Sequence, residues 1–210
     1  MPLPEWFIWD LGNVVLKLAW ERVVTSLVAS SSADAGAMKR LMEGPDGYRA
    51  MERGDVAFAE LFSLLRERAG YRGGIADLRE VWSDFFDGTV EGIVPLIERT
   101  RAIYRVAFLS NSNEVHEEVI PRQFPEVFRP DDPLILSHRQ KAAKPDPLLF
   151  VQALEILGTT ARQCIFVDDL RENVESALRL GFQAFQFIDT PSLVRTLEAR
   201  SLLPPVDGPR

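Results

Sequence analysis

Short runs of apolar residues, each followed by small or polar residues, recur along the chain and predict buried parallel strands. The four clearest runs lie at residues 6–9, 106–109, 134–136 and 164–167. A fifth run at residues 184–188 completes the expected sheet. Strands of this kind, separated by helices, are typical of a doubly wound, Rossmann-like α/β fold.

Helical patterns lie between the later runs and have clear start and stop signals. One helix is expected to begin with Asp146 as its N-cap and to end at Gly158. A second is expected to run from about Arg171 to Gly181 and to lead directly into the fifth strand. Each predicted helix therefore connects two predicted strands, as a parallel sheet requires.

The long interval between the first and second strands has almost entirely helical patterning and predicts an insertion. Apolar stripes at residues 58–65 and 75–85 have helical spacing, and Asp55 is the expected N-cap of the first. Weaker patterns cover residues 21–28 and 37–42. The interval is therefore expected to form a small bundle of four or so helices.

Two domains follow from this pattern. A core domain is expected from residues 1–15 and 89–210, and an all-helical cap domain from residues 16–88. The chain of 210 residues, with 46% hydrophobic residues, is long enough to bury the core that this organisation needs.

Composition excludes several classes of partner. The formal net charge is -7 and the basic residues are scattered, so no nucleic-acid surface is expected. The single cysteine, Cys164, excludes an internal disulfide and is expected to pack in a strand. No signal peptide and no apolar stretch of the ~20 residues that a membrane span needs are evident. We therefore expect a cytoplasmic protein without a membrane or nucleic-acid partner, and no pattern predicts its oligomeric state.

Polar residues stand at the ends of the predicted strands. The carboxyl ends of parallel strands meet at one edge of a sheet, where ligands of this fold class bind. Each group alone has a simpler explanation as a turn, a helix N-cap or a solvated loop, but their coincidence at successive strand ends favours one shared site. The residues are Asp10, Ser110, Asn111, Lys144, Asp168 and Asp169.

The motifs at residues 7–10, 108–111, 144–145 and 167–169 together resemble those of the haloacid dehalogenase superfamily. The likeness extends over the whole chain, including a helical cap in the usual place. The first motif, Asp-Leu-Gly-Asn-Val, and the segment Met-Glu-Arg-Gly-Asp at 51–55 resemble bacterial sugar-phosphate phosphatases of the glucose-1-phosphate type. The resemblance implies a Mg²⁺-dependent phosphomonoester hydrolase acting on a small phosphorylated metabolite, with a sugar phosphate as the expected substrate.

The resemblance also implies the roles of the metal-binding residues. Asp10 would attack phosphorus and form an aspartyl-phosphate. Mg²⁺ would be held by Asp10, by the main-chain carbonyl of Gly12 and by Asp169. Asp168 would act as a further ligand or hold a metal-bound water, and Asn173 would orient the carboxylate pair.

Other residues are expected to contact the substrate. The resemblance implies that Ser110 and Asn111 bind phosphoryl oxygens, while Lys144 balances their charge. In the cap, the candidates for contacting the leaving group are Tyr48, Arg49, Glu52 and Arg53. Arg53 has an alternative explanation as a charge at a helix end.

Two histidines, His116 and His138, lie beyond the predicted strand ends. His116 follows Ser110 on an expected helix and is expected to be exposed, although it also lies close enough in sequence to face the site.

Gly12 departs from the pattern of the superfamily's phosphatases, which usually carry an acid/base aspartate at this position. Such a group is typically worth ~10²–10⁴ in rate, so catalysis is slow, another group substitutes, or the leaving group is a good one. Two alternatives remain open. One is a carbon–halogen hydrolase that uses the same aspartate without metal, and the other is a non-catalytic binding protein.

Overall fold

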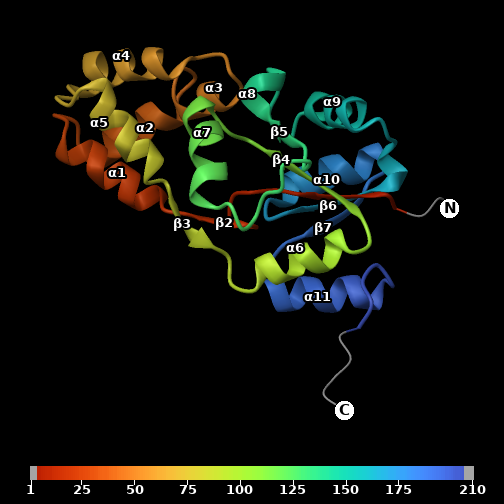
Figure 1. Ribbon diagram of the computed structural model, residues 1–210. Helices are drawn as coiled ribbons and strands as arrows, with labels where there is room; N and C mark the ends of the chain where they lie inside the picture. The colour runs from red at the N-terminus through yellow and green to blue at the C-terminus, as the bar shows by residue number, and fades with distance from the viewer. Residues whose placement is uncertain (1–3, 206–210) are drawn as a thin grey trace.

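The computed structural model describes residues 4–205, and its centre is a five-stranded parallel sheet (Figure 1). The strand order is β5-β4-β1-β6-β7, which confirms the predicted doubly wound fold. The fifth strand ends at Gln186 rather than Ile188, because the chain turns there to reach Asp189, the N-cap of helix α11. The strands are β1 (Trp6–Trp9), β4 (Arg105–Ser110), β5 (Leu134–Leu136), β6 (Cys164–Asp168) and β7 (Gln183–Gln186).

Helices cover both faces of this sheet. On β1, Phe7 and Trp9 enter one apolar core, whereas Trp6 and Ile8 enter the other. Because both faces are buried, successive strand residues must all be apolar, which explains the continuous apolar runs in the sequence. One face is covered by α6 (Ile93–Arg101) and α11 (Thr190–Ala199), and the other by α9 (Pro147–Leu157) and α10 (Arg171–Leu180).

The two helices with clear sequence signals form where they were predicted. The side chain of Asp146 accepts a hydrogen bond from the backbone N–H of Leu148 at 2.9 Å, as an N-cap does. Gly158 ends α9 with a φ of 63°, a left-handed conformation that favours glycine. Local signals are therefore sufficient to define these connections.

A helical insert lies between β1 and β4. Two short antiparallel strands, β2 (Leu16–Leu18) and β3 (Phe86–Thr89), flank it. Its apolar cluster includes the fully buried Leu61 and Trp82. The sequence patterns predict four of the five helices, but neither α3 nor the β2–β3 pair. The helices are α1 (Trp20–Ala29), α2 (Ala35–Glu43), α3 (Tyr48–Glu52), α4 (Phe58–Ala69) and α5 (Ile75–Ser83).

Two further helices and one 3-10 turn complete the described part of the core. They are α7 (Glu114–Gln123), α8 (Ser137–Gln140) and a single 3-10 turn at Ala161–Gln163. Within residues 4–205, no helix has both the length and the apolar character that crossing a bilayer requires.

The predicted start of the fourth helix is wrong. Asp55 does not cap α4, and its carboxylate pairs with Arg53 at 2.7 Å instead. The first free N–H groups of α4 are bonded by Glu60, three residues into the helix, and by Glu114 of the core. Each of these hydrogen bonds measures 2.7 Å, so two glutamates replace the expected cap.

The expectation that His116 is exposed is also wrong. Only 2% of His116 is exposed, and its ring packs against Phe85 and Phe86 of the insert. Its Nδ1 lies 3.0 Å from the side-chain nitrogen of Asn113. Burial lowers the pKa of His116 to about 3, because the charged imidazolium is poorly solvated there.

This burial predicts a dependence of stability on pH. An unfolded histidine titrates near pH 6.5, whereas folded His116 titrates near 3. Between these values the unfolded state binds the extra proton, so the free energy of unfolding falls as the pH is lowered through this window. Urea unfolding at about pH 7 and about pH 4.5 should show a smaller fall for His116→Gln than for the unmodified protein. Equal falls would contradict a neutral buried imidazole.

Candidate active site

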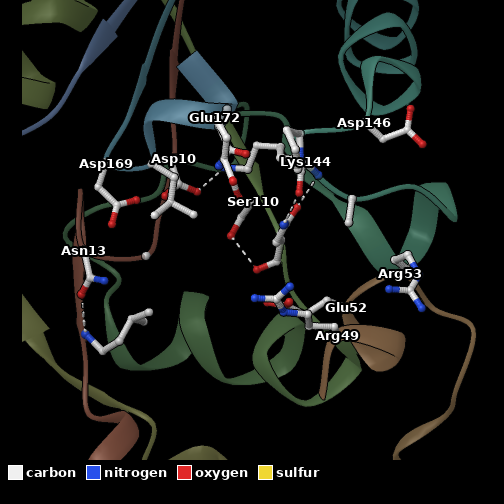
Figure 2. A pocket seen from close by; sticks show the side chains of 17 residues that line it. Asp10, Asn13, Arg49, Glu52, Arg53, Ser110, Lys144, Asp146, Asp169 and Glu172 are labelled. Carbon is white, nitrogen blue, oxygen red and sulfur yellow. Dashed lines mark hydrogen bonds and ion pairs between the residues drawn. The ribbon is translucent and has the colours of Figure 1, made fainter. Parts of the chain in front are cut away.

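The polar residues at the strand ends meet at one edge of the sheet (Figure 2). Asp10 follows β1, Ser110 ends β4, and Asp169 follows β6, while Lys144 reaches in from the loop between α8 and α9. These side chains line a cavity of about 440 Å³. The cavity lies beside β1, where the strand order reverses, which is the place where ligands bind in this fold class.

The ammonium group of Lys144 is buried among acceptors. Its Nζ lies 2.5 Å from Oδ1 of Asp10 and 2.7 Å from Oδ2 of Asp168. It also donates to the main-chain carbonyl of Leu109 at 2.9 Å, so all three protons are used. Burial alone lowers the pKa of Lys144, but attraction by Asp10 and Asp168 outweighs burial and raises the pKa above its usual value.

The carboxylates at this edge outnumber the single ammonium. Asp10, Asp168 and Asp169 each offer an oxygen, and these oxygens lie within 4.8 Å of one another. Burial raises the pKa of Asp10 to about 8, and although Lys144 opposes this rise, the two neighbouring carboxylates add to it. Burial and Asp168 also raise the pKa of Asp169. A cluster of oxygen ligands with surplus negative charge fits a hard divalent cation such as Mg²⁺.

Asp168 is fully buried, and both of its oxygens already accept hydrogen bonds. Oδ1 accepts from the side chain of Asn173 and from the backbone N–H of Leu170, each at 2.9 Å, whereas Oδ2 accepts from Lys144. The cavity itself is lined by Asp169 and not by Asp168. Asn173 therefore contacts the Asp168–Asp169 pair by donating a hydrogen bond to Asp168.

Ser110 and Asn111 follow one another but differ in surroundings. Ser110 lines the cavity beside Asp10, and its hydroxyl donates to the carbonyl of Asn111 at 3.2 Å. The side chain of Asn111 accepts from the backbone N–H of Lys144 at 2.8 Å and donates to its carbonyl at 3.0 Å. The Asn111 amide therefore fixes the loop that carries Lys144.

Gly12 lines the cavity without bringing a side chain to it. Its φ lies outside the left-handed region, and a Cβ placed there would meet Leu18 Cδ1 at 3.2 Å. Because that atom ends a flexible side chain, the backbone does not require glycine at this position.

Several further residues line the cavity without having been predicted as site residues. Asn13 has a φ of 54°, a conformation that asparagine tolerates better than most residues, and its hydrogen bond opposes the rise in the pKa of Asp169. The sequence offered only this Asn-after-Gly signal. The other lining residues that were not predicted are Leu18, Ala143, Pro145, Asp146, Leu170 and Glu172.

Three of the four predicted insert residues reach the cavity, and the fourth does not. Arg49, Glu52 and Arg53 line it, although Arg53 is also the C-cap of α3. Tyr48 instead stacks on Phe85, with ring centroids 5.9 Å apart. Tyr48 lines an adjoining cavity of about 240 Å³, which Arg49 and Glu52 share.

Glu52 has an unusual environment for a carboxylate. Burial raises its pKa to about 7, although the Tyr48 hydroxyl and the cations of Lys144, Arg49 and Arg53 all oppose the rise. The side chain is half-buried and opens onto the main cavity. A carboxyl group that titrates near neutral pH in a cavity is a candidate for proton transfer.

Comparison with known proteins identifies a protein family that this chain matches. A family model described as a haloacid dehalogenase-like hydrolase matches residues 5–181. A D-ribitol-5-phosphate phosphatase from Bacteroides thetaiotaomicron is 24% identical over 184 residues, which cover 85% of this chain and 89% of the relative.

Solved structures share the fold. A HAD family enzyme from Bacteroides thetaiotaomicron, solved as a magnesium complex, has a TM-score of 0.79 and 25% identity, over 93% of this chain and 100% of that one. A predicted HAD-like family hydrolase from Porphyromonas gingivalis also has a TM-score of 0.79, at 24% identity over 93% of this chain and 98% of that one.

Proposed function

This chain belongs to the haloacid dehalogenase-like hydrolases, and on that premise we propose that it is a magnesium-dependent phosphatase of a small sugar or polyol phosphate. One observation carries the proposal: Asp10, Asp169, Ser110 and Lys144 line a single cavity. They offer a nucleophile, a metal ligand, a hydroxyl donor and a cation, which are the groups that phosphoryl transfer needs. The magnesium complex and the phosphatase name of the two Bacteroides relatives support it.

The metal would be held by the carboxylates of Asp10 and Asp169 and by the main-chain carbonyl of Gly12. Asp168 would act as a further ligand or hold a bound water, and Asn173 keeps its carboxylate in place. When bound, Mg²⁺ would cancel the repulsion between the nucleophilic carboxylate and the phosphate dianion.

Asp10 would attack phosphorus in line and displace the sugar or polyol oxygen. The resulting aspartyl-phosphate would then be hydrolysed by water, so one difficult displacement becomes two easier ones. Ser110 would donate to a phosphoryl oxygen, and Lys144 would hold Asp10 in position through its contact with Oδ1. Asn111 would contribute its backbone N–H, because its side chain holds Lys144.

We favour this function over the two alternatives. Carbon–halogen hydrolysis by Asp10 has no use for a second carboxylate lining the cavity, and Asp169 beside Asp10 would add repulsion without a cation. A non-catalytic binding protein would not need a buried lysine bonded to the nucleophile. Both alternatives leave part of the cavity unexplained.

The two domains would have different roles in the reaction. The core, residues 1–15 and 89–210, would perform phosphoryl transfer, while residues 16–88 would act as the cap that selects the leaving group. The adjoining cavity offers aromatic faces from Trp20, Tyr48 and Phe85, and charged groups from Arg49 and Glu52. Aromatic faces and charged hydrogen-bonding groups suit a polyhydroxylated leaving group.

The test is a panel of phosphorylated metabolites assayed with Mg²⁺ and again after chelation. The panel includes ribitol 5-phosphate, glucose 1-phosphate and p-nitrophenyl phosphate. We expect turnover of at least one sugar or polyol phosphate, and its loss when the metal is removed. Failure to hydrolyse any phosphate ester in the presence of Mg²⁺ would contradict the proposal.

A substitution tests the metal site directly. Asp169→Asn is nearly isosteric, so we expect the melting temperature to stay close to that of the unmodified protein while Mg²⁺ affinity falls at least about tenfold. Titration calorimetry measures the affinity. Asp131→Asn, an exposed aspartate before β5, is the matched control. Unchanged affinity in the Asp169 variant would remove Asp169 from the ligand set.

A further inference from the structure

The proposed reaction lacks a proton donor in the core, because Gly12 brings no side chain to the cavity. The other lining carboxyl groups have other tasks or surroundings. Asp10 and Asp169 belong to the carboxylate cluster, and Asp146 caps α9. Glu172 is exposed in the first turn of α10. Resting on the proposed function, we propose that Glu52, carried by the insert, is the general acid and base of this site.

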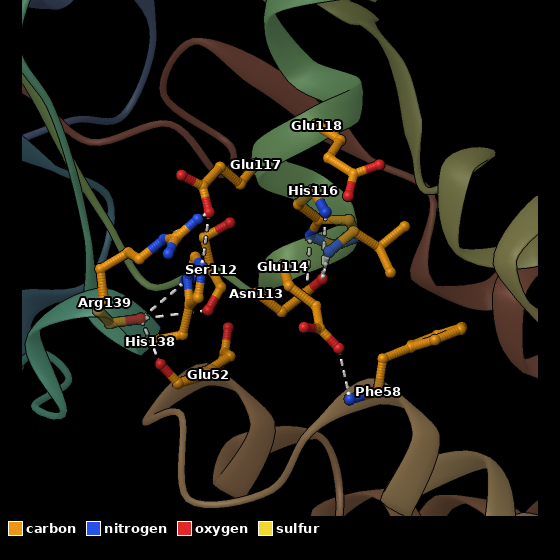
Figure 3. Close-up of polar contacts among 12 residues, drawn as sticks. Glu52, Phe58, Ser112, Asn113, Glu114, His116, Glu117, Glu118, His138 and Arg139 are labelled. Atoms are coloured by element: carbon orange, nitrogen blue, oxygen red, sulfur yellow. Dashed lines mark hydrogen bonds and ion pairs between the residues drawn. The ribbon is translucent and has the colours of Figure 1, made fainter.

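The core holds the end of α3 that carries Glu52 (Figure 3). The hydroxyl of Ser137, in α8, donates to the main-chain carbonyl of Glu52, and the ammonium of Lys141 donates to the carbonyl of Gly54. Gly54 has a φ of 69°, and a Cβ there would lie 2.3 Å from the carbonyl oxygen of His138. This close approach leaves no room for a side chain at residue 54, and together with the two hydrogen bonds it places the end of α3 against α8, with Glu52 over the core.

The groups facing Glu52 allow it both protonation states. From its own helix come the Tyr48 hydroxyl and the guanidinium of Arg49, with Arg53 following, and from the core comes the ammonium of Lys144. These groups favour the carboxylate, whereas burial favours the acid, and the balance puts the pKa at about 7. A group that must give a proton in one step and take one in the next works best near the operating pH.

The proton balance is then complete. In the first step a bond forms between the Asp10 carboxylate oxygen and phosphorus, the bond from phosphorus to the leaving oxygen breaks, and that oxygen takes the proton of Glu52. In the second step Glu52 accepts a proton from water, whose oxygen bonds to phosphorus and displaces the Asp10 oxygen. Inorganic phosphate leaves, and both carboxyl groups return to their first state.

The test compares two leaving groups in Glu52→Gln. The alcohol of an alkyl phosphate needs a proton to depart, whereas p-nitrophenolate does not. For an alkyl phosphate we expect kcat/KM to fall by about 10²–10⁴. For p-nitrophenyl phosphate we expect kcat/KM to be nearly retained, because it reports only the first step, while slow hydrolysis of the aspartyl-phosphate produces a burst of nitrophenolate.

Two further measurements separate proton transfer from a structural role. In the unmodified protein, kcat/KM for the alkyl phosphate should decline as the pH rises through about 7, and Glu52→Gln should lack this decline. Gly12→Asp in the Glu52→Gln background should recover alkyl phosphate turnover, since the added Cβ meets only the end of Leu18. Glu67→Gln, an exposed glutamate on α4, is the matched control.

The outcomes distinguish this inference from the proposed function. Equal losses for both substrates in Glu52→Gln, with an unchanged pH profile, would overturn the role of Glu52 and leave the phosphatase intact. Absence of turnover in the unmodified protein would overturn the phosphatase itself. Retained alkyl phosphate turnover in Glu52→Gln would also overturn the inference.

Discussion

Asp10→Asn is expected to abolish hydrolysis of every phosphate ester that the unmodified protein accepts. An amide is a far poorer nucleophile than a carboxylate, and loss of a nucleophile commonly costs on the order of 10⁴–10⁶ in kcat. The fold should persist, because the amide oxygen can still accept from Lys144 and a buried charge is removed. Phosphate release with Mg²⁺ measures the effect.

The same variant gives a second readout. Acid quenching during turnover should leave phosphate covalently attached to the peptide that contains Asp10 in the unmodified protein, and mass spectrometry should find none in Asp10→Asn. Asp131→Asn serves again as the exposed control. Appreciable turnover by the Asp10 variant, with no labelled peptide in either protein, would exclude an aspartyl-phosphate mechanism.

Lys144→Met is expected to lower stability as well as activity. Only 6% of Lys144 is exposed, and its ammonium lies between Asp10 and Asp168. Removing it leaves two buried carboxylates unpaired, and breaking a buried ion pair in this way typically costs about 3–5 kcal/mol. Urea unfolding without metal at about pH 9, where Asp10 of the unmodified protein is ionised, measures the loss, with Lys17→Met, an exposed lysine in β2, as the control.

The loss should depend on pH, because its cause is unpaired charge. The pKa of Asp10 is already raised to about 8 by burial, and removing the lysine raises it further. Protonated carboxyl groups need no cation, so the difference in unfolding free energy between Lys144→Met and the unmodified protein should be largest above about pH 8 and should shrink as the pH falls through this value. A loss below about 1 kcal/mol at about pH 9 would show that Lys144 behaves like a surface charge.

The sequence was most informative where a local pattern decides the structure. Four continuous apolar runs define four strands because both faces of the sheet are covered. The polar residues at their ends could then be brought together by topology alone, since parallel strands end at one edge. This topology predicts that Asp10, Ser110 and Asp169 lie together, and all three line one cavity.

The predictions from sequence that were wrong or missing concern features that depend on contacts between residues far apart in the chain. His116 is buried by Phe85 and Phe86, which are far from it in sequence. Helix α3 has only five residues, too few for a helical period to be recognised. Its position against α8 depends on contacts with Ser137 and Lys141 that no local pattern encodes.

The pairing of β2 with β3 bears on how such an enzyme can evolve. The two ends of the insert lie side by side as paired strands, so the intervening helices form a segment that recombination can exchange without interrupting the sheet. In a phosphatase whose general acid is a side chain of the core, such an exchange would alter only the range of substrates. Here Gly12 brings no acid to the core, and our proposal places the acid on the insert, so under that proposal an exchanged segment must carry its own proton donor. On the role proposed for Glu52, an exchange that removed this segment would therefore remove the proton donor as well as change the substrate range.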